Sequence, residues 1–219
     1  MKTFSNELYY VTGSDEGENN YSNIEVFKAL KEWSYLSPEY LSPKLDIISS
    51  YNVKPNNYFF IREVMTGTIN YNGQNSNLIA TICDKLPKEF PVILSLENKA
   101  TRHLYPDHWI LLKEPIKDIH SLIYYSRILI SSGDSMAREG AILGVPSIYC
   151  GVREMKANNV MIKKGRLFHK PIEMVPDFMI GLLKDFSGED KELFRKSLKK
   201  EWIDVSKFII ERINNIKIS

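Results

Sequence analysis

The chain has 219 residues, of which 43% are hydrophobic and 26% are charged. This length suits one well-buried domain with appendages, and the apolar fraction excludes a wholly disordered chain. The 29 basic and 27 acidic residues leave a net charge of +2, which excludes the strong positive field of a protein that grips nucleic acid.

The N-terminal stretch does not resemble a targeting or membrane segment. MKTFSNELYY lacks the apolar core of a secretory signal, and no run of 18 apolar residues is present to span a membrane. Residues 7–12 (ELYYVT) predict one strand, and the polar, glycine-containing stretch 13–23 predicts a loop.

The next segments predict little regular structure before position 58. Residues 24–33 predict a short helix. Pro38 and Pro43 favour an extended crossing segment over residues 34–45, because each proline restricts the residue before it. Residues 1–57 are therefore expected to be an irregular N-terminal segment and linker.

From Tyr58 onward, strand and helix patterns alternate. Short apolar runs predict strands at 58–62, 91–95, 109–112, 127–131 and 146–150, with a short extended piece at 166–169. Helical spacing or capping residues predict helices at 78–86 (after Asn75 and Ser76 as caps), 118–125, 135–143, 157–163, from 172, and over 190–215. This alternation predicts an α/β fold with a mainly parallel sheet, right-handed crossovers and a long C-terminal helix.

The most informative stretch is RILISSGDSMAREGAILGVPSIYC, residues 127–150, in which a buried strand runs directly into a helix. Gly133 permits either a close backbone approach or a positive φ. The backbone amides at the start of a helix have no partner within the helix. They therefore predict an anion site, suited to a diphosphate, over Ser132, Gly133, Asp134, Ser135 and Met136. The alternative is an ordinary tight turn in which Asp134 or Ser135 caps the helix.

Glu139 lies one turn into the same helix. Its carboxylate is placed to accept hydrogen bonds from ribose hydroxyls, or else it is a solvated surface glutamate.

Four further residues are weaker candidates, and the first three lie near the predicted carboxyl edge of the sheet. Arg62 ends the first core strand and either pairs with phosphate or is a surface arginine. Ser95 and Glu97 follow the second strand at the same edge. His120 opens a helix and is a weak candidate for a catalytic base, the alternative being a packed or capping histidine.

A serine hydrolase is a competing interpretation. Gly133-Asp-Ser135-Met-Ala137 approximates the nucleophile elbow G-x-S-x-G, and Glu154 and His169 follow in the order acid, then histidine. The final glycine is alanine, however, and no oxyanion loop is recognisable upstream, so this alternative is the weaker one.

Other chemistry leaves no motif in the sequence. Cys83 and Cys150 make neither a disulfide framework nor a metal pair, which fits a reducing cytoplasm. There is no Walker sequence, G-x-G-x-x-G, H-E-x-x-H or C-x-x-C. No metal and no cofactor are expected.

The block from Tyr58 to Gly165 resembles the C-terminal lobe of GT-B-type nucleotide-sugar enzymes. It is most similar to a prokaryotic domain-of-unknown-function family related to the non-hydrolysing UDP-N-acetylglucosamine 2-epimerases and the GlcNAc transferase of peptidoglycan synthesis. The matching features are Arg62 after the first strand, the Asp118-Ile-His120 turn, and Gly133-Asp-Ser-Met with Glu139-Gly140 and Leu143-Gly144-Val-Pro146. The tract Glu32-Trp-Ser-Tyr35-Leu-Ser-Pro38 also resembles the family's linker between lobes.

This resemblance implies a Rossmann-like lobe that binds a nucleotide sugar, in particular a UDP-sugar. In the relatives the turn holds the diphosphate and the glutamate holds the ribose. Those roles fall here on Ser132 to Met136 and on Glu139, with Arg62 offsetting the charge. Two residues depart from the family pattern: Asp134 replaces the second glycine of the turn, and Gly140 replaces an alanine.

The N-terminal part departs further, because a GT-B enzyme works in a cleft between two lobes. Residues 1–57 are too few for a full first lobe, and residues 58–219 are expected to form the nucleotide-binding lobe with its C-terminal helices. The chain is therefore truncated or split, completed by a partner chain or a second copy, or converted to a non-catalytic half-module. Whether it is an enzyme, and which residue would be its base, stays open.

Overall fold

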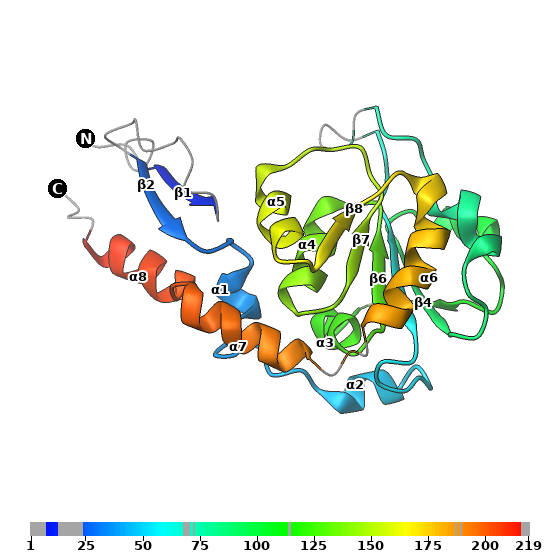
Figure 1. Ribbon diagram of the computed structural model, residues 1–219, viewed down its shortest axis with the longest axis horizontal. Coiled ribbons are helices and arrows are strands. Elements are labelled where there is room, and N and C mark those ends of the chain that lie inside the picture. The colour runs from blue at the N-terminus through cyan, green and yellow to red at the C-terminus, as the bar shows by residue number, and fades with distance from the viewer. Residues whose placement is uncertain are drawn as a thin grey trace.

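The computed structural model describes residues 8–12, 24–67, 71, 73–113, 115–186, 188 and 190–215. In these ranges the chain forms a six-stranded sheet with helices on both faces, and a separate two-stranded sheet (Figure 1). The strands of the large sheet, in chain order, are β3 (Phe59–Glu63), β4 (Val92–Leu96), β5 (Ile110–Leu111), β6 (Ile128–Ser131), β7 (Ser147–Tyr149) and β8 (Leu167–His169). The loop predicted at 13–23 lies outside the described residues.

The large sheet is parallel in every strand pair, with the order β5-β4-β3-β6-β7-β8. This confirms the predicted Rossmann-like sheet, and the piece expected at 166–169 is its sixth strand. The chain builds outward from β3 in one direction and then returns to start again at β6. The carboxyl ends of β3 and β6 therefore flank the switch point, where open α/β sheets bind their ligands.

Helices cover the two faces of this sheet. One face carries α3 (Ile119–Tyr124), α4 (Asp134–Ile142) and α5 (Lys156–Lys163), and the other carries the 3₁₀ helices η3 (Ile79–Lys85), η4 (Lys99–Leu104) and η5 (Ile172–Met174) with α6 (Val175–Asp185). Along β3, Phe60 packs in the core on the α4 side, while Phe59 and Ile61 pack on the η3 side. By the same alternation Arg62 belongs to the α4 face and Glu63 to the opposite face.

The N-terminal segment contains a strand pair where a helix was expected. Strand β1 (Leu8–Thr12), which confirms the first predicted strand, pairs in parallel with β2 (Ile24–Lys28). The helix predicted over 24–33 is wrong, because residues 24–28 form β2, and Ile24 and Val26 are β-branched residues, which favour strands.

The linker was also predicted incorrectly, since residues 34–45 are not extended throughout. Helix α1 (Trp33–Leu36) occupies its start, and α2 (Leu45–Ser49) follows it. Pro38 restricts only Ser37, whose φ of −63° and ψ of 156° are extended, so the proline ends α1 without preventing it.

Two predicted helices differ in detail. The segment at 78–86 is the 3₁₀ helix η3, and no side chain caps its start at Leu78. The C-terminal helical region is present over 190–215 but divides into α7 (Lys191–Glu201) and α8 (Val205–Asn215). Trp202 leaves the helix with extended backbone, and the Asp204 carboxylate accepts a hydrogen bond from the Lys207 amide at 3.0 Å to start α8.

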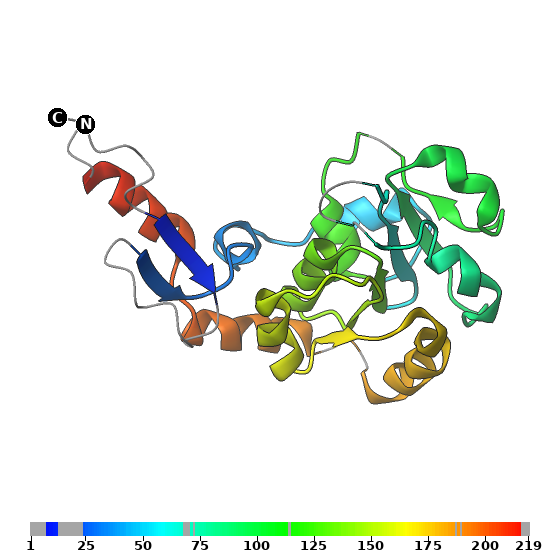
Figure 2. The same ribbon diagram turned by 90° about the horizontal axis from the view of Figure 1, so that it is seen from above.

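The C-terminal helices return to the N-terminal segment. Trp33 of α1 meets Trp202 edge-on with ring centroids 5.3 Å apart, and the Ser206 hydroxyl donates to the Ser34 carbonyl at 2.7 Å. The β1–β2 pair and α8 lie together, away from the six-stranded sheet, in both views (Figures 1 and 2).

Candidate functional site

The turn after β6 connects both strands of the switch point. The Ser131 hydroxyl donates to the Gly133 carbonyl at 2.7 Å, and its oxygen accepts the Gly133 amide at 3.0 Å. The Ser132 hydroxyl oxygen accepts the Val64 amide at 2.9 Å, just beyond the end of β3. Ser132, one of the predicted turn residues, therefore fixes the loop that follows β6 against the loop that follows β3.

Gly133 is required by close packing and not by its backbone angles. Its φ is −109°, which any residue adopts. A Cβ at this position would lie 2.6 Å from Val64 Cγ1 and 3.1 Å from the Tyr71 hydroxyl. Of the two reasons that the sequence offered for this glycine, the structure shows a close approach, and the approaching groups are side chains of this chain.

Gly133 is also the N-cap of α4, and no side chain caps this helix, so neither Asp134 nor Ser135 takes the capping role. The amides in the first turn of a helix have no partner within the helix. Ser135 is exposed and Met136 is half-buried, which places the second and third residues of α4 at the surface. The start of α4 thus offers backbone donors at the switch point.

Asp134 turns away from that surface. Its side chain is 1% exposed, with Oδ2 3.1 Å from Arg138 and Oδ1 3.6 Å from Arg153. Arg138 in turn donates to Glu32 Oε1 at 2.7 Å and to Asn158 Oδ1 at 2.7 Å. The Asp134 carboxylate therefore lies between two guanidinium groups, and it shares that of Arg138 with Glu32.

Glu139 and His120, which the sequence identified separately, lie together. Glu139 Oε2 is 3.2 Å from His120 Nε2, and its Oε1 accepts the Tyr35 hydroxyl at 2.8 Å. The Tyr35 and His120 rings have centroids 5.6 Å apart. Burial and the nearby Glu139 carboxylate raise the pKa of Tyr35 far above its ordinary value, which keeps this hydroxyl protonated as a donor.

Arg62 lies at the carboxyl edge, on the α4 face, with its predicted neighbours. Its guanidinium donates to Ser95 Oγ at 2.8 Å and to Glu97 Oε1 at 2.5 Å. The other Glu97 oxygen accepts the Met65 amide at 2.8 Å. Arg62 therefore already has an anionic partner within the protein.

Sequence reasoning missed Arg153, Tyr35 and the Glu32–Arg138 pair. Arg153 follows β7 at the same sheet edge as the α4 start, and its side chain is 36% exposed. The rule that places ligands beyond the carboxyl ends of parallel strands was enough to identify it. Tyr35 carried no signal beyond its place in the linker, because its contact with Glu139 spans 104 positions.

The hydrolase constellation is not assembled. His169 Nε2 lies 2.8 Å from the Gly151 carbonyl oxygen, and its ring lies against Tyr149 with centroids 4.7 Å apart. Within the described part of the chain, no hydrogen bond joins His169 to Ser135.

No helix among the described residues is long and apolar enough to cross a membrane.

Comparison with protein families and curated proteins gives two matches. A family model described as "Protein of unknown function (DUF354)" matches residues 28–217. The "Uncharacterized protein MJ0665" of Methanocaldococcus jannaschii is 26% identical over 102 residues, which are 45% of this chain and 30% of that protein.

Solved structures share the fold at low sequence identity. The UDP-GlcNAc 2-epimerase of Methanocaldococcus jannaschii, in complex with UDP-GlcNAc and UDP, gives a TM-score of 0.57 at 11% identity over 88% of this chain and 55% of that one. The corresponding enzyme of Neisseria meningitidis, bound to UDP-GlcNAc, gives 0.52 at 18% identity over the same shares. The spinosyn forosaminyltransferase SpnP gives 0.52 at 12% identity over 89% and 50%. The chain thus has a glycosyltransferase-like GT-B fold and spans about half the length of these proteins.

Proposed function

The chain belongs to the family described as "Protein of unknown function (DUF354)", and we propose that it is the nucleotide-sugar-binding lobe of a glycosyltransferase- or 2-epimerase-like protein. The start of α4 supports this proposal. It lies at the switch point between β3 and β6, its first turn has no side-chain cap, and the acidic side chain beside it points inward to arginines. A diphosphate at this position would accept backbone hydrogen bonds and gain from the helix dipole.

Arg153 is the cation best placed to assist. It lies beside the first residue of α4 and is more exposed than Arg62, and its contact with Asp134, at 3.6 Å, is longer than the 2.5 Å contact of Arg62 with Glu97. We therefore assign the diphosphate to the amides of Ser135 and Met136 together with Arg153, and we give Arg62 a supporting place at the same edge.

The ribose is assigned to Glu139. Both of its oxygens already receive one protein donor, from Tyr35 and from His120, and each carboxylate oxygen has capacity for a second. These two contacts fix the carboxylate one turn beyond the diphosphate position. His120 is then a positioning residue for Glu139, and this role fits its observed contact better than that of a catalytic base.

Two of the neighbours in fold were solved with UDP-GlcNAc, which supports a nucleotide sugar as the ligand class. We propose a UDP-sugar, bound by residues 58–219. The sugar-facing side of the cleft would come from a second lobe in a partner chain, in a second copy, or in a longer form of the protein. A non-catalytic half-module is the alternative that keeps the same nucleotide site.

Isothermal titration with UDP, UDP-N-acetylglucosamine and uridine tests this proposal. Both diphosphates should bind and uridine should bind far more weakly. Glu139→Ala should weaken UDP at least tenfold, since each hydrogen bond to a charged group contributes about 1.5–3 kcal/mol. Glu154→Ala removes an exposed glutamate beyond β7 and serves as the control. If neither UDP nor UDP-N-acetylglucosamine binds, the proposal is overturned. Binding of these ligands without turnover would favour the half-module.

A further inference from the structure

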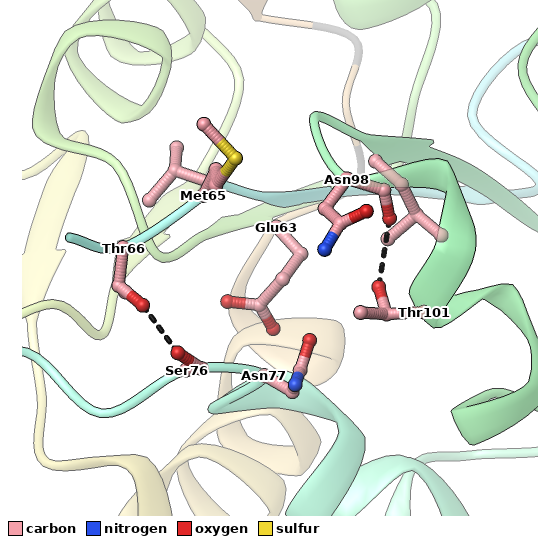
Figure 3. Close-up of a pocket in the computed structure, with 9 residues that line it drawn as sticks. Glu63, Met65, Thr66, Ser76, Asn77, Asn98 and Thr101 are labelled. Carbon is pink, nitrogen blue, oxygen red and sulfur yellow. Dashed lines mark hydrogen bonds between the residues drawn. The ribbon is translucent and has the colours of Figure 1, made fainter. Parts of the chain in front are cut away.

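The loop between β3 and η3 contacts the turn that follows β6. The structure describes residues 64–67, 71 and 73–78 of this loop. A hydrogen bond between the Thr66 and Ser76 hydroxyls joins the two sides of the loop near its ends (Figure 3). Farther along, the Gln74 amide donates to the Tyr71 carbonyl at 3.2 Å. The described part of the loop is therefore held by hydrogen bonds of its own.

Gln74 connects this loop to two others at the carboxyl edge of the sheet. Its side chain is 7% exposed, with Nε2 donating to the Ser132 carbonyl at 3.1 Å and Oε1 accepting the Val152 amide at 3.3 Å. Ser132 belongs to the turn before α4, and Val152 directly precedes Arg153. One buried amide group therefore positions the β3–η3 loop relative to the start of α4 and to Arg153.

Tyr71 of this loop lies beside the start of α4. The Cβ that Gly133 lacks would be 3.1 Å from the Tyr71 hydroxyl oxygen, and Gly133 is the N-cap of α4. Tyr71 is half-buried, and none of the described residues makes a hydrogen bond with its hydroxyl. A partly buried hydroxyl without a protein partner, next to the unpaired amides of a helix start, is available to a ligand at that start.

The charged groups around this hydroxyl indicate which ligand it suits. Burial raises the pKa of Tyr71, and the Asp134 and Glu97 carboxylates raise it further, so the hydroxyl keeps its proton and is a donor. Each of these carboxylates already contacts an arginine. The guanidinium groups of Arg153 and Arg62 act on the same hydroxyl. A diphosphate offers several anionic acceptor oxygens to such a set of donors.

We propose that Tyr71 donates a hydrogen bond to the diphosphate of the bound nucleotide, and that Gln74 is the positioning residue that places Tyr71 and Arg153 around it. This inference rests on the proposed function, because it takes the diphosphate to lie at the start of α4. It adds a phenol donor to the backbone amides and the guanidinium. Groups from the loops after β3, β6 and β7 then meet at one diphosphate.

Isothermal titration of the full chain with inorganic pyrophosphate, UDP and uridine tests the role of Tyr71. Tyr71→Phe keeps the ring and removes the hydroxyl. It should weaken pyrophosphate and UDP by the same factor of about ten, because both ligands carry the diphosphate, and it should leave uridine unchanged. Tyr51→Phe, at a half-buried tyrosine after α2, is the matched control and should change none of the three affinities.

Glu139→Ala distinguishes a contact with the diphosphate from a contact with the ribose. It should weaken UDP and leave pyrophosphate unchanged, because pyrophosphate has no ribose, whereas Tyr71→Phe should weaken both. A Tyr71→Phe variant that binds pyrophosphate and UDP as tightly as the wild type would overturn the proposal. Tighter binding would also overturn it, since the hydroxyl would then obstruct the amides of α4.

The role of Gln74 is tested by a double variant. Gln74→Leu removes both hydrogen bonds of the side chain and should weaken pyrophosphate at least as much as Tyr71→Phe does. Adding Tyr71→Phe to Gln74→Leu should cause little further loss, because the hydroxyl is then already displaced. Strictly additive losses in binding free energy would overturn the positioning role.

The same titrations separate this inference from the proposed function. If the wild type binds neither UDP nor pyrophosphate, the nucleotide site itself is overturned. If the wild type binds both ligands and Tyr71→Phe changes neither affinity, only the role of Tyr71 is overturned and the nucleotide site stands.

Discussion

Glu32 and Arg138 lie 106 positions apart and form a buried ion pair, with Arg138 Nη2 2.7 Å from Glu32 Oε1. Their side chains are 1% and 3% exposed. Burial alone would raise the pKa of Glu32, but the adjacent guanidinium more than offsets this and holds the pKa below its ordinary value. The pair joins the linker to α4, so the position of Tyr35 over Glu139 depends on it.

Breaking this pair should destabilise the fold. Glu32→Gln removes one charge and leaves Arg138 with the Asp134 carboxylate and the neutral Asn158, and such changes cost about 3–5 kcal/mol. Urea denaturation measures the loss. The double variant Glu32→Gln/Arg138→Met should lose less than the sum of the single variants, because it leaves no unpaired guanidinium. Strict additivity would mean that the two side chains do not act as a pair.

Gly140 should tolerate a methyl group poorly. A Cβ would lie 2.3 Å from Leu129 Cδ2 and 2.6 Å from Ser147 Oγ. We expect Gly140→Ala to cost about 1–3 kcal/mol through overpacking of α4 against the sheet. A Cβ on Gly181 in α6 would meet nothing within 4 Å, so Gly181→Ala should instead stabilise by about 0.5–1 kcal/mol. Thermal unfolding of the two variants should shift in opposite directions.

Substitutions of Arg153 and of Arg62 should weaken nucleotide binding to different extents. Arg153→Met should weaken UDP about tenfold while leaving uridine unchanged, because a partly exposed guanidinium acts through the diphosphate charge. Arg62→Met should have a smaller effect, since its guanidinium is held by Ser95 and Glu97. Calorimetry at two salt concentrations checks both variants. A larger loss for Arg62→Met would return the phosphate role to the residue that the sequence favoured.

The parts of the fold with local signals were predictable. Val92–Leu96 and Ile128–Ser131 are fully buried strands, and a continuous apolar run indicates them without further information. Asp118 caps α3 through the Ser121 amide, as its position before the helix predicts. The strand at Ile24–Lys28 was missed because a segment of five residues is too short for its periodicity to distinguish a strand from a helix.

The candidate site was predictable where its residues have a local sequence signal. The turn at Gly133 and the carboxylate of Glu139 follow from local spacing. The side chains that orient them, Tyr35 and Arg138 with its partner Glu32, depend on contacts between the linker and α4. Such contacts join positions more than 100 residues apart, and no local sequence pattern predicts them.

The burial of Glu63 should give the fold a measurable dependence on pH. Its pKa in the folded state is raised by burial above the value of about 4.5 of a free glutamate. Between those two pKa values the folded chain binds more protons than the unfolded chain. Stability must therefore fall as pH rises through this window, because the slope follows the excess of protons bound in the unfolded state.

Glu63→Gln removes the titration and keeps the shape, so the comparison of wild type with this variant isolates the effect. The wild type should be relatively more stable at pH 4.5 than at pH 8, by about 1.4 kcal/mol for each pKa unit of difference. Urea denaturation across this range measures the gap, and the other titrating groups cancel between the two proteins. A gap that stays constant, or that widens in favour of the wild type as pH rises, would mean that the Glu63 carboxyl is ionised at least as readily in the folded chain as in the unfolded one.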